Sequence, residues 1–254
     1  MKPDIPASQR LRLDELLVER GLFASRSRAR DAVSRKTVCV DGIVVSKPGR
    51  MVAGDAAIEI NDPAQNYVSR AALKLIAGLD CFDLDPSAKN ALDIGASTGG
   101  FTQVLLERGA AHVIALDVGH GQMSKKIATD KRVTCLEGLN ARDLVAADLG
   151  NLTPDFIVSD VSFISLKLAL PPALELAASG AQGVFLVKPQ FEAGRQAIGK
   201  GGLLKNPQDA DAVAADLQDW LNAQPGWRVL GLYPSPIEGG DGNREFLLGA
   251  VKDR

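Results

Sequence analysis

Apolar residues in the N-terminal part of the chain follow two different periods. Between residues 12 and 35 they recur every three or four positions in two stretches, which predicts two short amphipathic helices separated by a glycine. Ser25 stands directly before the second stretch and is suited to capping its first turn. Residues 38–45, V-C-V-D-G-I-V-V, have the pattern of a β-hairpin around an Asp-Gly turn, and a further strand is expected at 56–60. We therefore predict a small α+β domain over residues 1–60.

A polar, proline-containing stretch at 61–68 follows and is interpreted as a linker. Beyond it, over residues 69–254, strand patterns alternate with helical ones. Strands are expected at 90–95, 112–118, 133–138, 155–161, 183–188, 229–234 and 245–251, and helices at 69–78, 99–108, 121–128, 165–178 and 207–222. Such alternation is typical of an α/β domain, with a doubly wound, Rossmann-like parallel sheet covered by helices on both faces. Residues 189–205 show little periodicity and are interpreted as a lid or a binding loop.

Composition excludes several classes of protein. Apolar residues make up 46% of the 254 positions, yet no apolar run approaches the roughly 18 residues of a membrane span, and the N-terminus lacks a signal-peptide pattern. We therefore expect a cytoplasmic protein that does not act in a membrane. Cys39, Cys81 and Cys135 form no C-x-x-C pair, and we expect all three to be small buried apolar residues rather than disulfide partners. With only two histidines, His112 and His120, no metal site is expected.

Charge is distributed unevenly along the chain. Residues 1–60 hold eleven basic and eight acidic side chains, whereas the rest of the chain holds eighteen basic and twenty-three acidic ones. The excess is greatest between residues 20 and 50, with eight basic against two acidic residues. A basic small domain on an acidic body indicates that the small domain binds a polyanion. A solvated helix face is the alternative interpretation.

A glycine-rich turn is the most informative local pattern. Residues 91–101, A-L-D-I-G-A-S-T-G-G-F, predict a buried strand that ends near a carboxylate, turns on glycines and enters a helix. The next predicted strand ends in Asp117, 24 residues after Asp93, where a carboxylate can accept both hydroxyls of a ribose. This arrangement also fits NAD, but Ser97 stands where the dinucleotide pattern G-x-G-x-x-G has its second glycine. We expect a nucleoside-containing cofactor here, with an NAD-dependent oxidoreductase as an alternative.

Several motifs in order along the chain resemble one known family. The strings S-R-A-A-L-K-L, L-D-I-G-A-S-T-G-G-F-T, S-D-V-S-F-I-S-L and L-V-K-P-Q-F-E are similar to those of the TlyA family, which joins an S4 RNA-binding domain to an FtsJ-like methyltransferase. S-R-S-R-A-R-D-A-V and V-C-V-D-G-I-V-V resemble the S4 part. The resemblance covers residues 11–251. It implies a seven-stranded sheet whose last strand, 245–251, is antiparallel, and 2'-O-ribose methylation of a cytidine in ribosomal RNA with S-adenosyl-L-methionine as cofactor.

The resemblance also implies roles for individual residues. The catalytic set falls on Lys74, Asp160, Lys188 and Glu245. Cofactor contacts are expected from Asp93, Gly95, Ser97, Thr98, Gly99, Gly100, Phe101, Asp117 and Val118, with Asn140 or Asp143 near the adenine. Phosphates of structured RNA are expected to meet Arg12, Arg26, Arg28, Arg30, Lys36 and Lys47.

Two of the four catalytic positions agree with an independent physical argument. Asp160 and Lys188 end the fourth and fifth predicted strands, so both are expected at the crevice where ligands bind in such sheets. A charge there is costly unless it is paired, which favours contact between the two. A neutral lysine can accept a proton, so we hypothesise that Lys188 receives the proton of the ribose 2'-hydroxyl while Asp160, Lys74 and Glu245 position the reacting groups. A buried ion pair without chemistry is the alternative.

Other methyl-transfer chemistries predict other patterns. Methylation of a base amine favours [D/N/S]-P-P-[Y/F] after the fourth strand, where residues 160–163 read D-V-S-F. Methylation at a pyrimidine C5 requires a nucleophilic cysteine, and none is expected in the site. Two non-enzymatic alternatives remain at this stage, an S4 RNA-binding adaptor with an inactive methyltransferase fold and a membrane-active haemolysin; no strongly apolar cationic helix supports the second.

Overall fold

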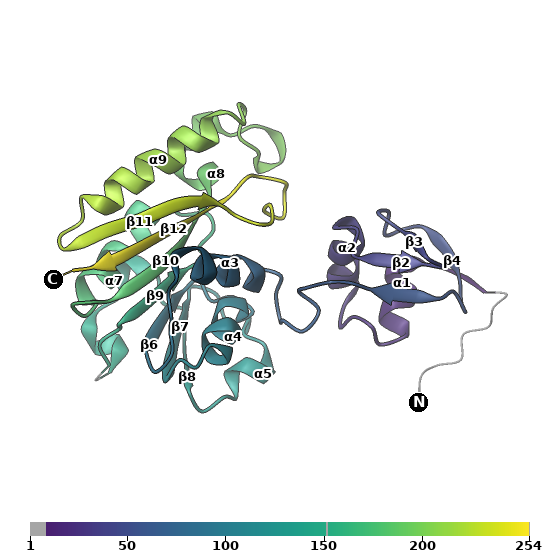
Figure 1. The fold of residues 1–254 in the computed structure, drawn as a ribbon, viewed down its shortest axis with the longest axis horizontal. Helices are drawn as coiled ribbons and strands as arrows, with labels where there is room; N and C mark the ends of the chain where they lie inside the picture. Colours follow the sequence, from purple (N-terminus) through teal and green to yellow (C-terminus); the bar gives the residue numbers. More distant parts are fainter. Residues whose placement is uncertain (1–8, 151, 254) are drawn as a thin grey trace. The chain divides into compact units, whose positions relative to one another are not determined.

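The chain folds into two compact units (Figure 1). The computed structural model describes residues 9–150 and 152–253. The first unit ends at Asn66 and the second begins at Tyr67, so the boundary lies inside the stretch predicted as a linker. Each unit has a hydrophobic core of its own.

The described part of the N-terminal unit contains two helices and five short strands. They are β1 (Arg10–Arg12), α1 (Leu13–Glu19), α2 (Arg26–Ser34), β2 (Val38–Val40), β3 (Ile43–Val44), β4 (Met51–Ala53) and β5 (Ile58–Ile60). The strands form a sheet in the order β3-β2-β5 and a separate β1–β4 pair. Both helices lie where the apolar spacing predicts them, and the Ser25 hydroxyl accepts the backbone N–H of Arg28 as an N-cap. β1 and β4 were not predicted, because R-L-R contains a single apolar residue and M-V-A shows no alternation of apolar and polar positions.

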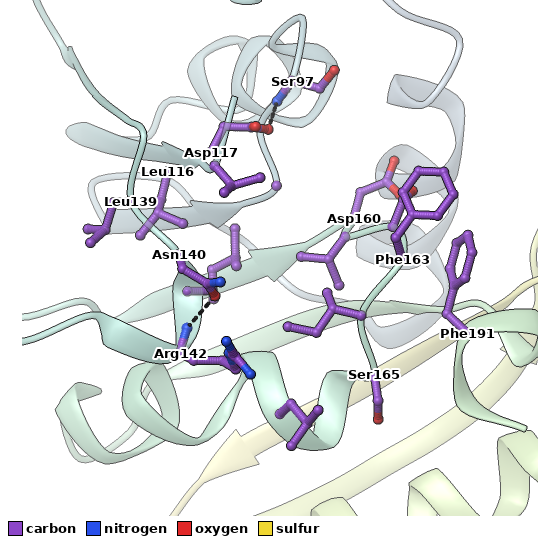
Figure 2. A pocket seen from close by; sticks show the side chains of 18 of the residues that line it. Ser97, Leu116, Asp117, Leu139, Asn140, Arg142, Asp160, Phe163, Ser165 and Phe191 are labelled. Carbon is purple, nitrogen blue, oxygen red and sulfur yellow. Dashed lines mark hydrogen bonds between the residues drawn. The ribbon is translucent and has the colours of Figure 1, made fainter. Parts of the chain in front are cut away.

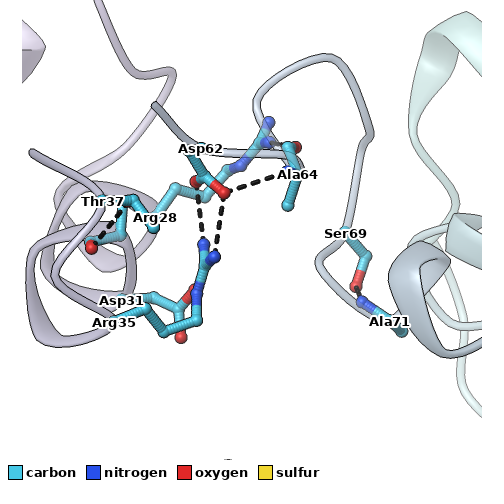
Figure 3. Close-up of polar contacts among 9 residues, drawn as sticks. Arg28, Asp31, Arg35, Thr37, Asp62, Ala64, Ser69 and Ala71 are labelled. Carbon is cyan, nitrogen blue, oxygen red and sulfur yellow. Dashed lines mark hydrogen bonds and ion pairs between the residues drawn. The ribbon is translucent and has the colours of Figure 1, made fainter. Parts of the chain in front are cut away.

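The first half of the predicted linker is fixed to the small unit (Figure 3). Both terminal nitrogens of Arg35 donate to the carboxylate of Asp62, each at 2.8 Å. The same carboxylate accepts the backbone N–H of Ala64 at 2.9 Å, and the Ala64 carbonyl accepts a hydrogen bond from Arg28 at 3.2 Å. Residues 61–64 therefore continue the packed structure of the small unit instead of forming a free tether.

The C-terminal unit alternates strands and helices as expected. Its first part comprises α3 (Ala72–Phe82), β6 (Asn90–Ile94), α4 (Gly100–Glu107), β7 (His112–Asp117), α5 (Lys125–Ala128), β8 (Val133–Glu137), η1 (Ala141–Asp143) and η2 (Ala146–Leu149). Its second part comprises β9 (Phe156–Ser159), α6 (Leu166–Ala169), α7 (Pro171–Leu176), β10 (Gln182–Val187), α8 (Pro189–Glu192), η3 (Arg195–Ala197), η4 (Lys200–Gly202), α9 (Asp209–Asn222), β11 (Trp227–Pro234) and β12 (Phe246–Lys252).

These strands form one seven-stranded sheet in the order β11-β12-β10-β9-β6-β7-β8. β12 runs antiparallel to both of its neighbours, and the other strands are parallel to one another. Alternate residues of the central strands face opposite ways: Ala91 belongs to a core cluster with α3, α4 and α5, whereas Leu92 belongs to one with α6, α7 and α9. The predicted doubly wound sheet with an antiparallel last strand is confirmed.

Two helices differ from the prediction for identifiable reasons. The helical pattern at 165–178 is divided into α6 and α7, because Pro171 and Pro172 lack the N–H that would continue the first helix and are suited to starting the second. The helix expected at 121–128 is limited to α5. Its first residues instead form a loop in which Gly121 has a φ of +63° and donates its N–H to Glu137.

The prediction that all three cysteines are buried is wrong. Cys81 is exposed near the end of α3, and Cys39 and Cys135 are half-buried. On β2 the buried residues are Val38 and Val40, so the alternation of a strand turns Cys39 to the opposite face. Cys135 lies on β8, an edge strand of the large sheet, where one side lacks a covering strand.

Candidate active site

The turn between β6 and α4 approaches the neighbouring strand closely. Gly95 and Gly99 have φ values of +82° and +92°, which glycine adopts without steric cost. A Cβ on Gly95 would lie 2.9 Å from the carbonyl oxygen of Asp160, so a larger residue would separate this turn from the end of β9. The glycines therefore place the turn directly beside one of the predicted catalytic residues.

The carboxylate of Asp117 is fixed at the end of β7. Its Oδ2 accepts the backbone N–H of Ser97 at 2.8 Å (Figure 2). Its Oδ1 accepts the backbone N–H of Gly119 at 2.7 Å. Each carboxylate oxygen has about two acceptor positions, so one on each oxygen is left for a ligand. Asp117 is thus suited to accept a pair of vicinal hydroxyls.

A cavity of about 930 Å³ lies at the carboxyl ends of β6, β7 and β9. Its lining combines apolar side chains such as Leu116 and Leu139 with the polar groups of Asp117, Asn140 and Arg142 (Figure 2). A smaller cavity of about 150 Å³ adjoins it, and Gly95, Ser97, Asp160 and Ser162 line both. A mainly apolar cavity with a few polar groups at this end of the sheet is the usual form of a cofactor site.

Most of the predicted cofactor residues line these two cavities. Gly95, Ser97, Asp117, Val118 and Asn140 line the larger one, and Thr98, Gly100 and Phe101 line the smaller one. Asp93, Gly99 and Asp143 line neither. Of the two candidates for the adenine end, the structure therefore places Asn140, and not Asp143, at the cavity wall.

Asp93 lies beneath the turn and is fully buried. Its Oδ2 accepts a hydrogen bond from the Thr102 hydroxyl at 2.6 Å, and its Oδ1 has no partner among the described residues. Burial, assisted by the negative charges of Asp160 and Asp117, raises the pKa of Asp93 to about 7. The residue is held away from both cavities, so it supports the turn from below.

The four predicted catalytic residues form two ion pairs. Lys188 Nζ lies 2.6 Å from Asp160 Oδ1 and donates to the Ser162 hydroxyl at 2.8 Å. Lys74 pairs with Glu245. Lys74, Glu245 and Lys188 are each at least nine-tenths buried, so these charges are withdrawn from water and depend on their partners.

The sheet register brings the two pairs to the same edge. Val187 at the end of β10 lies opposite Phe246 at the start of β12 in an antiparallel pairing. The residues that follow and precede them, Lys188 and Glu245, are consequently opposite each other at the carboxyl end of β10. Glu245 in turn contacts Lys74 from α3. Segments more than 170 residues apart along the chain are thus assembled beside the glycine turn.

Phe163 is a site residue that the sequence analysis did not single out. Its ring lines the larger cavity, is 91% exposed and lies 5.1 Å from the ring of Phe191 (Figure 2). Its φ of +66° is rare for a bulky side chain. In the sequence, the only signal for Phe163 was an aromatic residue within the motif S-D-V-S-F-I-S-L, next to the predicted catalytic Asp160. Ser162, which contacts Lys188, was also missed.

The predicted RNA-binding residues fall into two groups. Arg12 and Arg26 both contact the buried carboxylate of Asp14, at 3.0 and 3.1 Å, and Arg28 donates to a backbone carbonyl. Of these six predicted residues, Arg30, Lys36 and Lys47 are exposed and form no ion pair with the described residues. The first group is therefore partly engaged in structure, and the second is free to meet a polyanion.

The described residues were expected to contain neither a metal site nor a membrane-spanning helix. No group of three or more His, Cys, Asp and Glu side chains within residues 9–150 and 152–253 is arranged to hold a metal ion. None of the helices in that part of the chain has the length and apolar character needed to cross a membrane.

Comparison with known families identifies both units. A family model described as FtsJ-like methyltransferase matches residues 67–252, and one described as S4 domain matches residues 11–58. The chain belongs to the TlyA family of FtsJ-like methyltransferases. The chain is 42% identical to the 16S/23S rRNA (cytidine-2'-O)-methyltransferase TlyA of Mycobacterium tuberculosis, over 95% of its own length and 90% of that protein.

Further relatives cover comparable shares of both chains. Hemolysin A of Brachyspira hyodysenteriae is 38% identical over 93% of this chain and 98% of that protein. The 23S rRNA (cytidine-2'-O)-methyltransferase TlyA of Campylobacter jejuni is 37% identical over 74% of this chain and 72% of that protein. The solved structure of a hemolysin-named protein from Streptococcus thermophilus has a TM-score of 0.74 and 39% identity, and covers 96% of this chain and 88% of that chain.

Proposed function

We propose that this methyltransferase transfers a methyl group from S-adenosyl-L-methionine to the 2'-hydroxyl of a cytidine in ribosomal RNA. One observation carries the proposal: the Lys188–Asp160 pair lines the same small cavity as the glycine turn at 95–100. The proposed proton acceptor and the glycine turn proposed to bind the cofactor therefore line the same cavity. The names of the relatives from Mycobacterium and Campylobacter support ribose of ribosomal cytidine as the acceptor.

The residues present fit S-adenosyl-L-methionine. Asp117 offers two acceptor positions to the ribose hydroxyls, and the apolar wall around Leu116 and Leu139 suits the adenine, with Asn140 at its edge. The glycine turn leaves room for the methionine part, which we place in the smaller cavity along Thr98 and Gly100. When bound, the cofactor supplies an electrophilic methyl group.

The Lys188–Asp160 pair performs the proton chemistry in this proposal. Lys188 in its neutral form accepts the proton that leaves the ribose 2'-hydroxyl. The resulting ammonium is stabilised by Asp160 at 2.6 Å and by the Ser162 hydroxyl at 2.8 Å. Lys74 and Glu245 line neither cavity; they form the second buried ion pair, and their mutual pairing fixes both side chains. Much of the rate is then due to orientation of the hydroxyl beside the cofactor.

An aromatic face next to these pairs favours a nucleotide as acceptor. Phe163 presents an exposed ring at the cavity, backed by Phe191. A ring in this position can stack on a base that has been turned out of its helix, which places the attached ribose beside Lys188. The small S4 unit contributes phosphate contacts through Arg30, Lys36 and Lys47.

The test is the identity of the methylated nucleoside. The protein is incubated with isotopically labelled S-adenosyl-L-methionine and unmodified ribosomal subunits, and the RNA is digested and analysed by mass spectrometry. We expect label in 2'-O-methylcytidine. Label in a base-methylated nucleoside would contradict ribose as the acceptor, and the absence of both label transfer and cofactor binding would favour a non-catalytic RNA-binding adaptor.

A further inference from the structure

The loop that joins β9 to α6 is held in an unfavourable conformation. Residues 160–165 include Asp160 and Ser162, which contact Lys188, and Phe163, which has a φ of +66°. A phenylalanine in the left-handed region is strained and persists only where the surrounding structure determines it. Something must therefore fix this loop at both ends.

The near end of the loop is fixed by the sheet and by Lys188. The backbone N–H of Asp160 donates to the carbonyl of Ile94 at 3.0 Å, in continuation of the β6–β9 pairing. The Asp160 carboxylate forms an ion pair with Lys188, and the Ser162 hydroxyl accepts a hydrogen bond from the same ammonium group. These contacts define the loop only as far as Ser162, one residue before the strained position.

The far end of the loop is fixed by a single carboxylate, that of Glu192. Its Oε1 accepts the backbone N–H of Leu166 at 2.8 Å, and its Oε2 accepts the hydroxyl of Ser165 at 2.5 Å. Glu192 is the last residue of α8, four positions after Lys188, so both anchors of the loop come from the same short segment. Phe191 lies between them and contacts the ring of Phe163.

The surroundings of Glu192 show that this carboxylate is kept at a cost. Burial raises its pKa, and the negative charge of Asp216 acts in the same direction. The hydrogen bonds from Leu166 and Ser165 oppose that effect, as does Lys167, which itself pairs with Asp216 at 2.6 Å. Both oxygens of this partly buried carboxylate are hydrogen-bonded where the loop meets α6, one to Ser165 and one to Leu166. The carboxylate therefore fixes the position of this end of the loop.

We infer that Glu192 is a positioning residue for methyl transfer: through Ser165 and Leu166 it holds the 160–165 loop so that Phe163 stays at the cavity while Asp160 stays on Lys188. The inference rests on the proposed function and adds a residue to it. Glu192 lines the cavity rim but acts through the loop, since both of its oxygens are engaged by it.

The experiment compares Glu192→Ala with Glu192→Gln, and uses Glu175→Ala as a matched control because Glu175 is an exposed glutamate on α7 of the same unit. Loss of the anchor should lower kcat for RNA methylation by about 10- to 100-fold, because a small displacement of positioning groups has effects of this size. Affinity for S-adenosyl-L-methionine, measured by calorimetry, should change less than about threefold, because Asp117 and the glycine turn belong to other segments. Glutamine should restore most of the rate, since its amide oxygen can accept from Leu166 and its NH₂ can donate to Ser165.

A double-mutant cycle with Phe163→Ala separates positioning from general stability. If Glu192 acts through the loop that carries Phe163, Glu192→Ala should cost much less in the Phe163→Ala background than in the wild type. Equal costs in both backgrounds, or a parallel loss of melting temperature and cofactor affinity, would overturn the inference. Wild-type protein that forms 2'-O-methylcytidine while Glu192→Ala retains full activity would overturn it and leave the proposed function intact. Wild-type protein without ribose methylation would remove both.

Discussion

At the scale of single residues, the position of Glu245 depends on a neighbour that has no side chain. A Cβ on Gly239 would lie 2.7 Å from Glu245 Oε1, which is closer than real contacts of this kind. The carboxylate cannot simply turn away, because it is buried and paired with Lys74. The backbone at Gly239 thus forms one wall of the Lys74–Glu245 pair.

We predict that Gly239→Ala displaces the Glu245 carboxylate and lowers kcat by about tenfold or more, since misplacing a catalytic group by a fraction of an ångström already affects orientation. Gly240→Ala is the matched control, because a Cβ there would meet only Arg70 at 3.8 Å, an ordinary contact distance. Steady-state methylation rates measure the effect. Equal activity of the two variants would show that Gly239 does not constrain the site.

Asp93 makes stability depend on pH in a specific direction. Burial raises its pKa to about 7, above the usual value near 4 of an unfolded aspartate, so the folded state binds a proton more tightly. Its neutral form stabilises the fold below pH 4, and this contribution is lost as pH rises to about 7. Asp93→Asn keeps an acceptor for Thr102 and should remove the dependence, so its melting temperature should exceed that of the wild type by a few degrees more at pH 8 than at pH 5. A constant difference between the two proteins would contradict this.

Not all site residues were equally accessible from the sequence. Asp160 and Lys188 could be paired by physical reasoning, because each ends a predicted strand. An unpaired charge buried at that place would cost several kcal/mol, so each needs the other as a partner. Lys74 and Glu245 were available only through the family resemblance, since 171 residues separate them and a lone lysine on a helix is usually solvated. Phe163 and Glu192 depend on loop conformation, which apolar periodicity does not determine.

At the scale of elements, the Arg35–Asp62 pair anchors the end of the small unit. The side chain of Asp62 is almost fully buried, and burial alone would raise its pKa. The hydrogen bonds from Arg35 outweigh this effect, so the pKa of Asp62 lies below its usual value. The charged pair therefore stabilises this region at neutral pH, and its contribution is lost as the pH falls below the ordinary range of an aspartate.

We predict that Asp62→Ala loosens residues 61–65 and α2. It leaves the partly buried Arg35 with only its pair to Asp31 and the Ala64 N–H without its acceptor, a change that typically costs about 1–3 kcal/mol. Hydrogen–deuterium exchange should show faster exchange in these segments and little change in the C-terminal unit. Asp55→Ala, which removes an exposed carboxylate of the same unit, serves as the control. Unchanged protection in Asp62→Ala would show that the linker is not held by this pair.

The elements that were predicted best are those with the clearest periodicity. All seven strands of the large sheet lie within two residues of their expected bounds, because their mainly apolar runs are bounded by glycine, proline and polar residues. The division into α6 and α7 is due to Pro171 and Pro172, and the apolar spacing of the segment does not indicate it. β1 and β4 lack the apolar runs and the turn signal that identify β2, β3 and β5, so only their mutual pairing identifies them.

At the scale of the whole molecule, basic residues are in excess in the small unit and acidic residues in the larger one. This distribution supports the proposal that the small unit supplies the RNA contacts. The structure narrows the candidates for RNA contact, because Arg12 and Arg26 are bonded to Asp14 while other basic residues are free. Reversing the engaged arginines would disturb the fold as well as binding. The informative positions are the exposed ones, Arg30, Lys36 and Lys47.

We predict that reversing Arg30, Lys36 and Lys47 to glutamate weakens RNA binding by about tenfold or more and flattens its salt dependence, since fewer counterions are released. Affinity for S-adenosyl-L-methionine should be unchanged. A control with Lys89, Lys126 and Lys131 reversed carries the same change in net charge on the other unit. Filter binding across a salt series measures the effect, and equal losses in both triple variants would contradict a dedicated role of the small unit.

The most direct measurement is the single-turnover rate of Lys188→Met at saturating S-adenosyl-L-methionine and RNA, with Lys205→Met, an exposed lysine, as control. Methionine keeps the length of the side chain but cannot accept a proton. We predict a loss of about 10²- to 10⁴-fold in ribose methylation, the usual contribution of a positioned proton acceptor, with cofactor affinity close to that of the control. The melting temperature should fall by several degrees, because Asp160 loses its partner, while the protein stays folded at the assay temperature. A folded Lys188→Met protein that methylates ribose at the wild-type rate would contradict the role of this lysine.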